Sequence, residues 1–201
     1  MANAARTGFW PVHNQGATAT QEKRVRVASN NGTAIFLGDC VTRTAAGVWG
    51  LASAGGGVSG VSQGASYWDP GQLVRKEGAY LPASTTYSST AFDMYGETDQ
   101  SFLRITADPL NVRYECQAKA STTGAITDTT KNANFSAGAG STTTGISGHL
   151  LDTLATTAAL DFAVMDVKRN VLNDPTAVNF KFIVQINILT VPPVAAGAAG
   201  N

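Results

Sequence analysis

Apolar and polar residues alternate most regularly near the end of the chain. Between residues 179 and 188, every second position is aromatic or β-branched: Phe180, Phe182, Val184, Ile186 and Ile188. The positions between them are mostly polar. A period of two places successive side chains on opposite faces of a strand, so this stretch predicts a β-strand with one buried face.

The same period returns over residues 112–119. One set of positions is predicted to face the core: Val112, Tyr114, Cys116 and Ala118. The alternate set is predicted to face water: Arg113, Glu115, Gln117 and Lys119. This stretch therefore predicts a second half-buried strand.

Several shorter stretches also predict strands. Arg24-Val25-Arg26-Val27 alternates, Asn30-Asn31-Gly32 tolerates positive φ and Ala34-Ile35-Phe36-Leu37 is apolar, so residues 24–37 predict a β-hairpin. Further strands are predicted at 58–61, at 72–75 after the turn Trp68-Asp69-Pro70-Gly71, at 101–105 and at 160–164.

Two stretches do not carry a strand pattern. Residues 121–147 are rich in Thr, Ser, Gly, Ala and Asn, which predicts a long loop outside the core. Leucines at helical spacing make a helix conceivable over residues 149–159, but Thr153, Thr156 and Thr157 are β-branched and oppose it. The secondary structure of this second stretch stays open.

Short strands, turns rich in Gly and Pro, and almost no helical pattern predict an all-β protein, an antiparallel β-sandwich or barrel. Residues 1–22 show neither period and predict an extended N-terminal arm. Residues 23–191 form the predicted β domain, and residues 192–201 a flexible tail. A chain of 201 residues fits one such domain.

The charge balance narrows the choice of partners. Lys plus Arg and Asp plus Glu each number 14, so no basic field exists to attract nucleic acid or an anionic membrane, and neither is expected as a partner. Charged residues make up 14% of the chain, against roughly a quarter in ordinary domains. A surface this weakly charged favours association with neighbouring molecules.

The expected site of folding is the cytosol, because the N-terminus has no apolar run of signal-peptide length and no stretch of about 18 apolar residues occurs. Cys40 and Cys116 are the only cysteines, too few for a disulfide framework or the usual four-ligand zinc site. Both are expected in the core, although a bridge between them stays open.

One catalytic pattern occurs in the chain. Gly60-Val61-Ser62-Gln63-Gly64 matches the G-x-S-x-G of a nucleophile elbow, but residues 65–71 cannot form the helix that the elbow requires. The only downstream histidine is His149, with Asp93, Asp99 or Asp108 as candidate orienting acids. We therefore expect that the protein is not an enzyme.

No metal or cofactor is expected either. Asp93, Glu97 and Asp99 surround Gly96, but they lack the dense alternation of acidic residues in a calcium loop. His13 and His149 are the only histidines, and nothing in their spacing indicates a metal site.

A series of short segments spans most of the chain and carries a family resemblance. They are Gly8-Phe9-Trp10-Pro11-Val12, Ala34-Ile35-Phe36-Leu37-Gly38-Asp39-Cys40-Val41, Val58-Ser59-Gly60-Val61, Asp108-Pro109, the strand at 112–119, residues 145–148, Leu160-Asp161-Phe162, Asn173-Asp174-Pro175 and Phe182-Ile183-Val184-Gln185-Ile186-Asn187. In order and content, they resemble segments of the capsid decoration, or cement, proteins of tailed bacteriophages, especially those of marine and cyanobacterial phages.

This resemblance implies a protein on the outer surface of the virion, made in the host cytoplasm. It implies a homo-oligomer, a dimer or trimer, that binds the major capsid protein and braces the junctions between capsomers. The predicted arm is the candidate segment for gripping the capsid or a neighbouring subunit. Large apolar and aromatic residues are the candidate interface residues: Phe9, Trp10, Val12, Trp49, Tyr67 and Trp68.

An alternative function uses the same β architecture. Another virion part, such as a tail or fibre component, would place aromatic residues in a shallow groove to stack on sugar rings. Affinity for glycans would separate this carbohydrate-binding protein from a cement protein.

Overall fold

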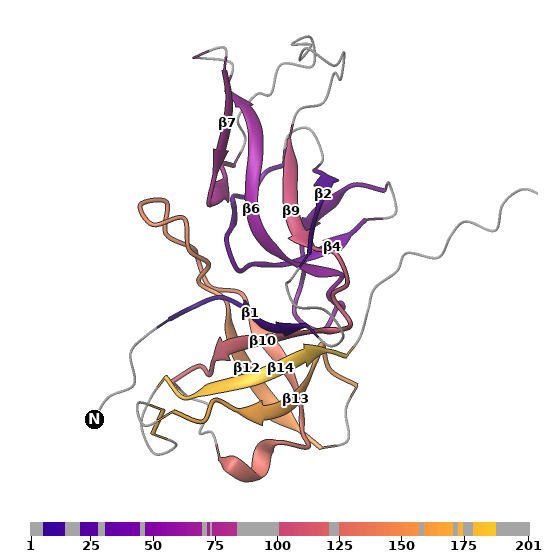
Figure 1. The fold of residues 1–201 in the computed structure, drawn as a ribbon, viewed down its shortest axis with the longest axis vertical. Helices are drawn as coiled ribbons and strands as arrows, with labels where there is room; N and C mark the ends of the chain where they lie inside the picture. The colour runs from indigo at the N-terminus through magenta and orange to yellow at the C-terminus, as the bar shows by residue number, and fades with distance from the viewer. Residues whose placement is uncertain are drawn as a thin grey trace, which may run out of the picture.

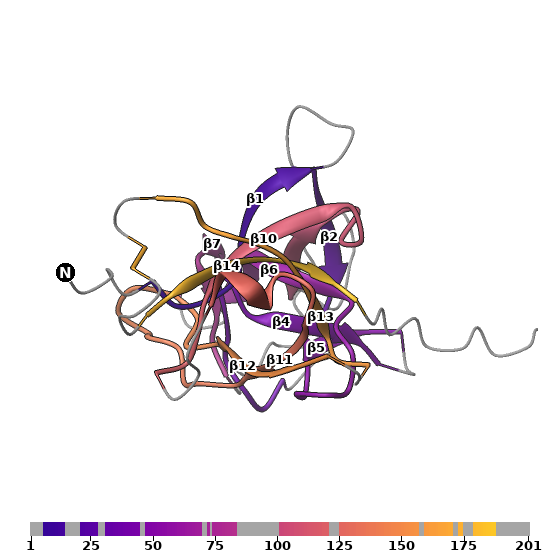
Figure 2. The same ribbon diagram turned by 90° about the horizontal axis from the view of Figure 1, so that it is seen from below.

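Figures 1 and 2 draw a computed structural model of the chain. The structure describes residues 6–14, 21–27, 31–44, 47–69, 72, 74–83, 101–120, 125–156, 159–170, 173–174 and 179–187. In these ranges it contains fourteen β-strands and one 3-10 turn, η1 (Ile126–Asp128). The strands form two lobes that lie one above the other in Figure 1, and we call the upper one the open lobe and the lower one the curled lobe.

The curled lobe holds a six-stranded antiparallel sheet in the spatial order β1-β10-β14-β13-β11-β12. Its strands are β1 (Trp10–Asn14), β10 (Val112–Gln117), β11 (Asn132–Ser136), β12 (Leu150–Ala155), β13 (Phe162–Val167) and β14 (Lys181–Ile186). The sheet curves until β12 returns beside the end of β10, where Ala118 and Leu151 form a single parallel bridge. Figure 2 shows this curvature from below.

The curved sheet encloses the larger of the two cores. Its largest fully buried side chains are aromatic: Phe9, Tyr114, Phe135, Phe162 and Phe182. The Phe9 ring stacks on Phe162 with a centroid distance of 4.6 Å, and Phe135 meets Phe9 edge to face at 6.4 Å. Burial of these rings is the main favourable term for this lobe.

The open lobe holds a second antiparallel sheet, in the order β2-β9-β6-β4-β5, with β7 beside β6. Its strands are β2 (Glu22–Arg26), β4 (Cys40–Arg43), β5 (Trp49–Leu51), β6 (Gly60–Asp69), β7 (Val74–Gly78) and β9 (Phe102–Thr106). A two-stranded ribbon, β3 (Ile35–Phe36) with β8 (Tyr80–Leu81), lies against it. The core of this lobe is smaller and mostly aliphatic: Val27, Ile35, Val41, Trp49, Ala65, Leu81, Leu103 and Ile105.

The two lobes meet where two glycines approach each other. The Phe9 N–H donates to the Gly38 carbonyl at 3.0 Å, and the Gly8 N–H donates to the His149 carbonyl at 2.9 Å. Gly38 has a φ of 90°, and a Cβ atom there would lie 3.1 Å from the Phe9 nitrogen. Only glycine meets both demands, so this position fixes how the N-terminal segment joins the lobes.

The predicted fold class is confirmed: the described chain is all-β, with several antiparallel sheets in a sandwich-like arrangement. Of the two predicted architectures, a closed barrel is not formed, because a single bridge joins β12 to the β10 end and no ladder follows it within the described residues. The strands predicted at 112–119 and 179–188 are present as β10 and β14. Val112, Tyr114, Cys116 and Ala118 are buried as predicted.

Two predictions of local structure were wrong, and the open question over residues 149–159 is answered. Residues 24–37 do not form a hairpin, because β2 pairs with β9 and β3 pairs with β8. Residues 121–147 contain β11, whose Ala133 and Phe135 are core residues. Residues 149–159 contain β12 and no helix in their described part, and the β-branched Thr153 lies in that strand.

The predicted arm needs a correction over its described residues. Residues 10–14 are β1, the strand at one edge of the curled sheet, and Phe9 lies in the core of that lobe. Burial of an aromatic side chain of this size lowers the free energy more than its exposure to water. This explains why Phe9 lies in the core and not in an extended arm. Residues 1–5 and 15–20 and the predicted tail, 192–201, lie outside the described residues.

No helix within the described ranges has the length and apolar character needed to cross a membrane.

Candidate interaction surfaces

The six candidate interface residues do not form one surface. Phe9 is fully buried and Trp49 is 9% exposed, so both serve the cores of their own chain, and their assignment to an interface was wrong. Trp10 and Val12 lie on β1 in the curled lobe, whereas Tyr67 and Trp68 lie on β6 in the open lobe. Two separate places on the molecule therefore carry the remaining four residues.

The first place is the outer edge of β1. Val12 is 47% exposed. The Trp10 indole N–H donates to the Thr7 carbonyl at 2.8 Å, and the Arg6 guanidinium lies 4.1 Å from the centre of the Trp10 ring. Pro11 lacks an N–H, and the pairing with β10 shifts between Pro11 and His13. These features protect the edge against pairing with another strand, and Val12 is left as its apolar contact point.

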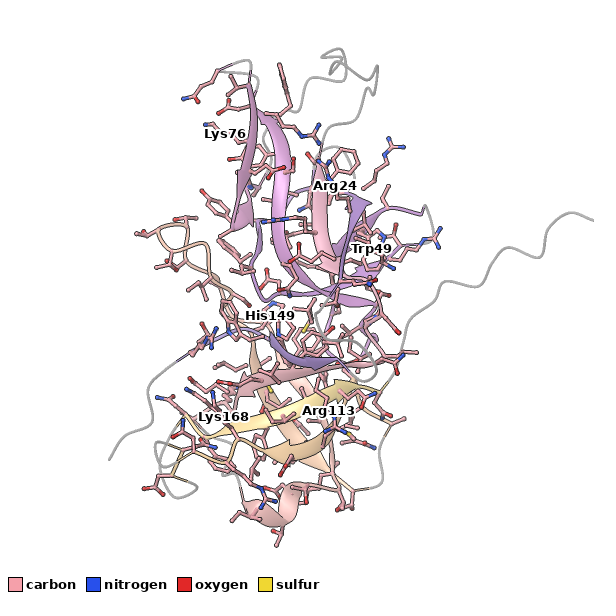
Figure 3. The ribbon with its side chains drawn as sticks, in the orientation of Figure 1. Arg24, Trp49, Lys76, Arg113, His149 and Lys168 are labelled. Atoms are coloured by element: carbon pink, nitrogen blue, oxygen red, sulfur yellow. The ribbon has the colours of Figure 1, made fainter. Side chains whose placement is uncertain are left out.

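The second place is one face of the open sheet. Tyr67 packs against the core of the open lobe, and alternation along β6 puts Trp68 on the opposite, outer face. The pairing of β6, β7, β9 and β2 brings side chains from four strands to this outer face: Arg24, Arg26, Ser66, Trp68, Arg75, Phe102 and Arg104, together with Glu22 and Glu77. We call this set the arginine face, and Figure 3 labels its member Arg24.

Contacts within the arginine face hold two guanidinium groups around one ring. The guanidinium carbon of Arg24 lies 5.0 Å from the centre of the Phe102 ring, and that of Arg75 lies 5.2 Å from it. Both side chains also donate to the Ser66 hydroxyl oxygen, Arg24 Nη2 at 3.2 Å and Arg75 Nε at 2.7 Å. A cation held over an aromatic ring is attracted by the ring's negative face, so Phe102 fixes the two charges close together.

Among the described residues of this face, arginines outnumber glutamates. It carries four arginines and two glutamates, and the ion pair between Arg104 and Glu22 is long, at 4.0 Å. The Arg104 Nε and the Trp68 Nε1 are buried without a hydrogen-bond acceptor in the part of the chain that the structure describes. Such donors gain free energy from an acceptor that reaches them.

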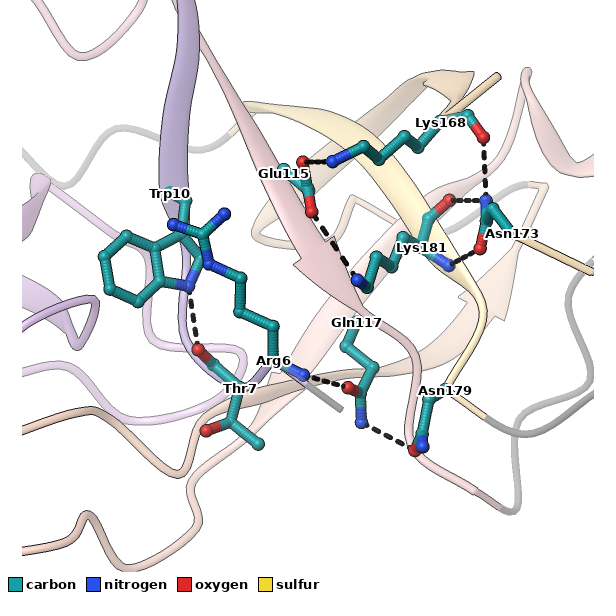
Figure 4. Close-up of polar contacts among 9 residues, drawn as sticks. All are labelled: Arg6, Thr7, Trp10, Glu115, Gln117, Lys168, Asn173, Asn179 and Lys181. Carbon is teal, nitrogen blue, oxygen red and sulfur yellow. Dashed lines mark hydrogen bonds and ion pairs between the residues drawn. The ribbon is translucent and has the colours of Figure 1, made fainter. Parts of the chain in front are cut away.

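The outer face of the curled sheet is organised in the opposite way, as Figure 4 shows. Glu115 is buried and binds the Lys168 ammonium, and the Lys181 Nζ lies 4.0 Å from its other oxygen. Gln117 accepts from the Arg6 backbone N–H at 2.8 Å and donates to Asn179 at 2.9 Å. The prediction that Glu115 and Gln117 face water was therefore wrong, because residues from distant segments cover them.

The serine of the G-x-S-x-G pattern is not activated by His149. Ser62 is fully buried within β6 and not on a strand-to-helix turn. His149 Nδ1 accepts from the Cys40 N–H at 3.2 Å, and its Nε2 lies 3.4 Å from Asp39 Oδ1. Within the described residues, His149 therefore lies against Asp39 and the Cys40 N–H, and it makes no hydrogen bond with the Ser62 hydroxyl.

Asp39 and His149 form a buried pair at the junction of the lobes. Burial lowers the pKa of His149 below its usual value, and the nearby Asp39 carboxylate opposes this change. Burial also raises the pKa of Asp39, against the effects of His149 and of the Phe36 N–H, which donates to Asp39 Oδ2 at 2.8 Å. The pair joins the turn before β4 to the segment before β12, which is a structural role.

A cavity of about 410 Å³ lies between the N-terminal segment and the loop before β12. It is lined by Arg6, Thr7, Ala139, Ser141, Thr144, Ile146, Ser147 and Gly148. Four of these residues carry a hydroxyl group, and no lining residue is aromatic. The cavity therefore lacks the aromatic platform that the carbohydrate-binding alternative requires.

Both cysteines are buried as free thiols, and burial raises the pKa of Cys40 and of Cys116 well above the usual value. Within the described ranges, no three His, Cys, Asp or Glu side chains are placed to hold a metal ion. Of the acidic residues considered for calcium or for orienting His149, Asp93, Glu97 and Asp99 lie outside the described residues. Asp108 is exposed and accepts from the Asn111 side-chain amide at 2.6 Å, whereas the acid beside His149 is Asp39.

Comparisons of the chain with protein-family models, with curated proteins and with solved structures found no match. The candidate surfaces therefore rest on the geometry described above. The sequence contains a signal for the arginine face in the alternation of Arg24, Val25 and Arg26. The pairing of β2 with β9, which places Arg24 near Phe102, could not be inferred from that alternation.

Proposed function

We propose that this protein is a decoration protein of a tailed-bacteriophage head, which binds the outside of the major capsid protein shell and stabilises it. It acts as a homo-oligomer. The proposal starts from the resemblance of the short segments quoted above to this family. The fold of the described chain, all-β and antiparallel, agrees with what that resemblance implies.

The observation that carries the proposal is the convergence of those segments in space. Gly8 and Phe9 contact Gly38, Cys40 pairs with Val61, and the Phe9 ring stacks on Phe162. The Leu37 N–H donates to the Gly145 carbonyl at 3.0 Å, which adds the segment 145–148. Segments separated by more than a hundred residues thus build one junction.

This convergence supports the resemblance for a physical reason. Chance similarities of four or five residues would be scattered over a structure, whereas residues that build one close contact are constrained together. Gly38 and Phe9 are constrained in this way by their contact. The function is carried over from the resemblance by analogy.

The surface of the molecule suits the same function. A ligand that binds only the assembled shell stabilises that shell by mass action. Such a ligand needs at least two contact regions, one for the shell and one for its own neighbours. The edge of β1 around Val12 and the arginine face are two such regions, and they lie on different lobes.

The direct test is cosedimentation of the full chain with expanded phage heads that lack a decoration protein. Saturable binding, with heads that then resist heat or loss of divalent cations, is the expected result. Heads already decorated serve as the control and should not bind more protein. Folded protein that does not bind the undecorated heads would remove the proposal, and affinity for a glycan array would then favour the carbohydrate-binding alternative.

The contact region on β1 is tested with point substitutions. Removal of residues 2–21 is unsuitable for this purpose, because it would remove Phe9 from the core. Val12→Asp adds a charge at the edge of β1, and Ile126→Asp adds the same charge at η1, where Ile126 is 62% exposed. We expect Val12→Asp to weaken binding or self-association and Ile126→Asp to leave both unchanged. Equal behaviour of the two variants would exclude the β1 edge as a contact.

A further inference from the structure

We propose that His149 is an acid-sensitive link between the two lobes: uptake of a proton by its ring releases the turn before β4 from the segment before β12. Figure 3 labels His149 where the two lobes meet. The residue precedes β12 of the curled lobe, whereas its ring contacts Asp39 and Cys40 at the start of β4, a strand of the open lobe. The inference goes beyond the proposed function and does not depend on binding to phage heads.

The hydrogen bonds of the His149 ring show where an added proton binds. The Cys40 backbone N–H donates to His149 Nδ1 at 3.2 Å, so Nδ1 is an acceptor and carries no hydrogen. The hydrogen of the neutral ring is therefore on Nε2, which lies 3.4 Å from Asp39 Oδ1. A second proton has to bind Nδ1. There it would face the Cys40 N–H, and two hydrogens would meet where one hydrogen bond is now.

Both sides of this hydrogen bond are shielded from water. Cys40 is fully buried, His149 is 3% exposed, and the Phe135 ring stacks on the imidazole with 5.0 Å between ring centres. A buried backbone N–H that loses its acceptor is costly, and water cannot replace His149 while the junction is closed. The closed junction therefore disfavours the second proton, whereas an open junction, in which water solvates the ring, accepts it.

The Asp39 carboxylate acts on the ring against this effect. It attracts the charged form of His149, but its Oδ2 accepts from the Phe36 N–H at 2.8 Å, and the Ser147 hydroxyl also bonds to the carboxylate. The Oδ1 atom that faces His149 makes no hydrogen bond among the described residues. Burial outweighs the attraction, because the pKa of His149 lies below its ordinary value.

The other titratable groups of this region act on Cys40 and not on the His149 ring. They are the Cys116 thiol, the Asp161 carboxylate and the Tyr114 hydroxyl. Burial raises the pKa of both thiols and of Tyr114, so these three groups stay uncharged near neutral pH. Within the described residues, the response to acid between neutral pH and pH 5 is therefore assigned to His149.

Solvent lies close to the segment that holds the ring. The cavity of about 410 Å³ is lined by Ser147 and Gly148, the two residues before His149, and by the exposed Arg6. The Ser147 hydroxyl oxygen also accepts from the His149 backbone N–H at 2.9 Å. A small displacement of this segment would admit water to the ring.

The sign of the effect follows from the two states of the junction. In the open junction the pKa of His149 is the ordinary value of 6.5, whereas in the closed junction it is lower. The link is therefore complete above pH 6.5. Below that pH, the ratio of open to closed molecules rises by up to about tenfold per unit of pH, until the pH falls below the closed-state pKa.

Labelling of Cys40 measures the open state. Its thiol packs in the core of the curled lobe although β4 belongs to the open lobe, so release of the turn exposes it. The full chain is treated with a pyridyl disulfide, a reagent that remains reactive in acid, from about pH 7.5 to about pH 5. We expect labelling of Cys40, corrected for the rate of a small thiol, to rise several-fold below pH 6.5.

His149→Gln is the decisive variant in this test. Glutamine keeps an acceptor for the Cys40 N–H but takes up no proton in this range, so the rise in labelling should disappear. His13→Gln is the matched control, because His13 is the only other histidine of the chain, and it should keep the rise. A rise that persists in His149→Gln, or one that disappears in His13→Gln, would overturn the proposal.

A titration of the unmodified chain keeps the proposal testable if His149→Gln does not fold. By NMR, we expect the His149 ring to titrate below pH 6.5 and the Cys40 amide to shift with the same midpoint. A His149 ring that titrates at pH 6.5 or above, or a Cys40 amide that does not respond, would overturn the link.

Amide hydrogen exchange separates release of the junction from unfolding of the whole chain. At a pH where Cys40 is labelled, the amides of Phe9 and Cys40 should lose protection, because both donate across the junction. The amides of β10 and β14 should keep theirs. Equal loss of protection in β10 and β14 would show global unfolding and overturn the proposal. None of these measurements uses phage heads, so their failure leaves the proposed function untouched.

Discussion

The curled lobe and the open lobe are built from the same kind of strand but treat their charges differently. On the outer face of the curled sheet, Glu115 is buried against Lys168 and Lys181, and the amide of Gln117 is bonded on both sides. On the outer face of the open sheet, the arginines outnumber the acids, and buried donors lack acceptors among the described residues. The curled lobe therefore satisfies the polar groups of its outer face within the chain. The open lobe leaves polar groups of its outer face without partners among the described residues.

The difference extends to the cores. The curled lobe buries several aromatic rings in contact with one another, whereas the core of the open lobe is mostly aliphatic and smaller. Burial of apolar area is the dominant favourable term in folding. The curled lobe is therefore expected to provide most of the stability, and the open lobe most of the surface for binding.

The largest expected effect follows from removing an aromatic ring of the curled lobe. Phe162→Ala deletes a fully buried ring that stacks on Phe9 and meets Phe135. We expect a loss of about 3–5 kcal/mol in the free energy of unfolding, measured by urea denaturation. Ile126→Ala, at an exposed site, serves as the control and should change stability by less than about 0.5 kcal/mol. A similar loss in both variants would contradict the account of the core.

A smaller effect is expected from the buried acid of the curled lobe. The double substitution Lys168→Met and Lys181→Met leaves Glu115 buried without its two cations. We expect a loss of about 2 kcal/mol, reduced from that of a fully buried pair because the Lys168 side chain is one-third exposed.

The matched substitution in the open lobe is Lys76→Met, which breaks the exposed pair with Asp69. Its effect on the free energy of unfolding should be much smaller than that of the double variant. If Lys76→Met destabilises the protein as much as the double variant does, the proposed difference between the polar groups of the curled lobe and those of the open lobe fails.

A pH-dependent effect is expected at the junction of the lobes. The pKa of His149 is lowered in the folded protein, so the unfolded chain takes up a proton first as pH falls below about 6.5, the ordinary histidine value. This contribution to stability is therefore present above pH 6.5 and is lost as pH falls through the lower folded-state pKa. His149→Gln should flatten the decline in stability between pH 7 and pH 5, measured by thermal unfolding.

Asp39 acts in the opposite sense in a lower range of pH. Because its pKa is raised in the folded protein, its contribution is present below the ordinary value of 3.8 and is lost as pH rises through the folded-state pKa. Asp39→Asn should therefore reduce the loss of stability that accompanies this rise. An unchanged pH profile in both variants would contradict the buried pair.

The smallest expected signal is the reactivity of the two thiols. Cys40 lies on β4 of the open lobe but packs in the core of the curled lobe, together with Cys116. Burial and a raised pKa should keep both thiols unreactive toward a disulfide reagent in the native protein. Both should become reactive at the same urea concentration if the lobes unfold together. Earlier reaction of Cys40 would show that the open lobe separates first.

The sequence predicted the strongest strands because their period of two is long and regular. Tyr114 and Phe182 were placed on the buried side for that reason, and the structure buries both. β11 was missed because Asn132-Ala133-Asn134-Phe135-Ser136 is short and rich in small polar residues, so its composition is that of a loop. Only the pairing with β12 and β13 makes it a core strand.

The candidate surfaces were harder to predict, because they depend on which strands pair. Local signals at Asn30-Asn31-Gly32 favoured a hairpin, but β2 forms its ladder with the distant β9. That long-range pairing puts Arg24 beside Phe102, whereas the local hairpin of β6 and β7 puts Arg75 beside Trp68. The burial of Glu115 likewise depends on lysines more than fifty residues away.

The measurement that tests the account most directly is amide hydrogen exchange on the full chain, free and bound to undecorated phage heads. The account predicts added protection on binding in β2, β6, β7 and β9, the strands that carry the arginine face. Protection confined to β11, β12 and β13 would contradict the assignment of the binding surface to the open lobe. No added protection anywhere, with the protein folded and the heads in excess, would contradict binding to the capsid shell itself.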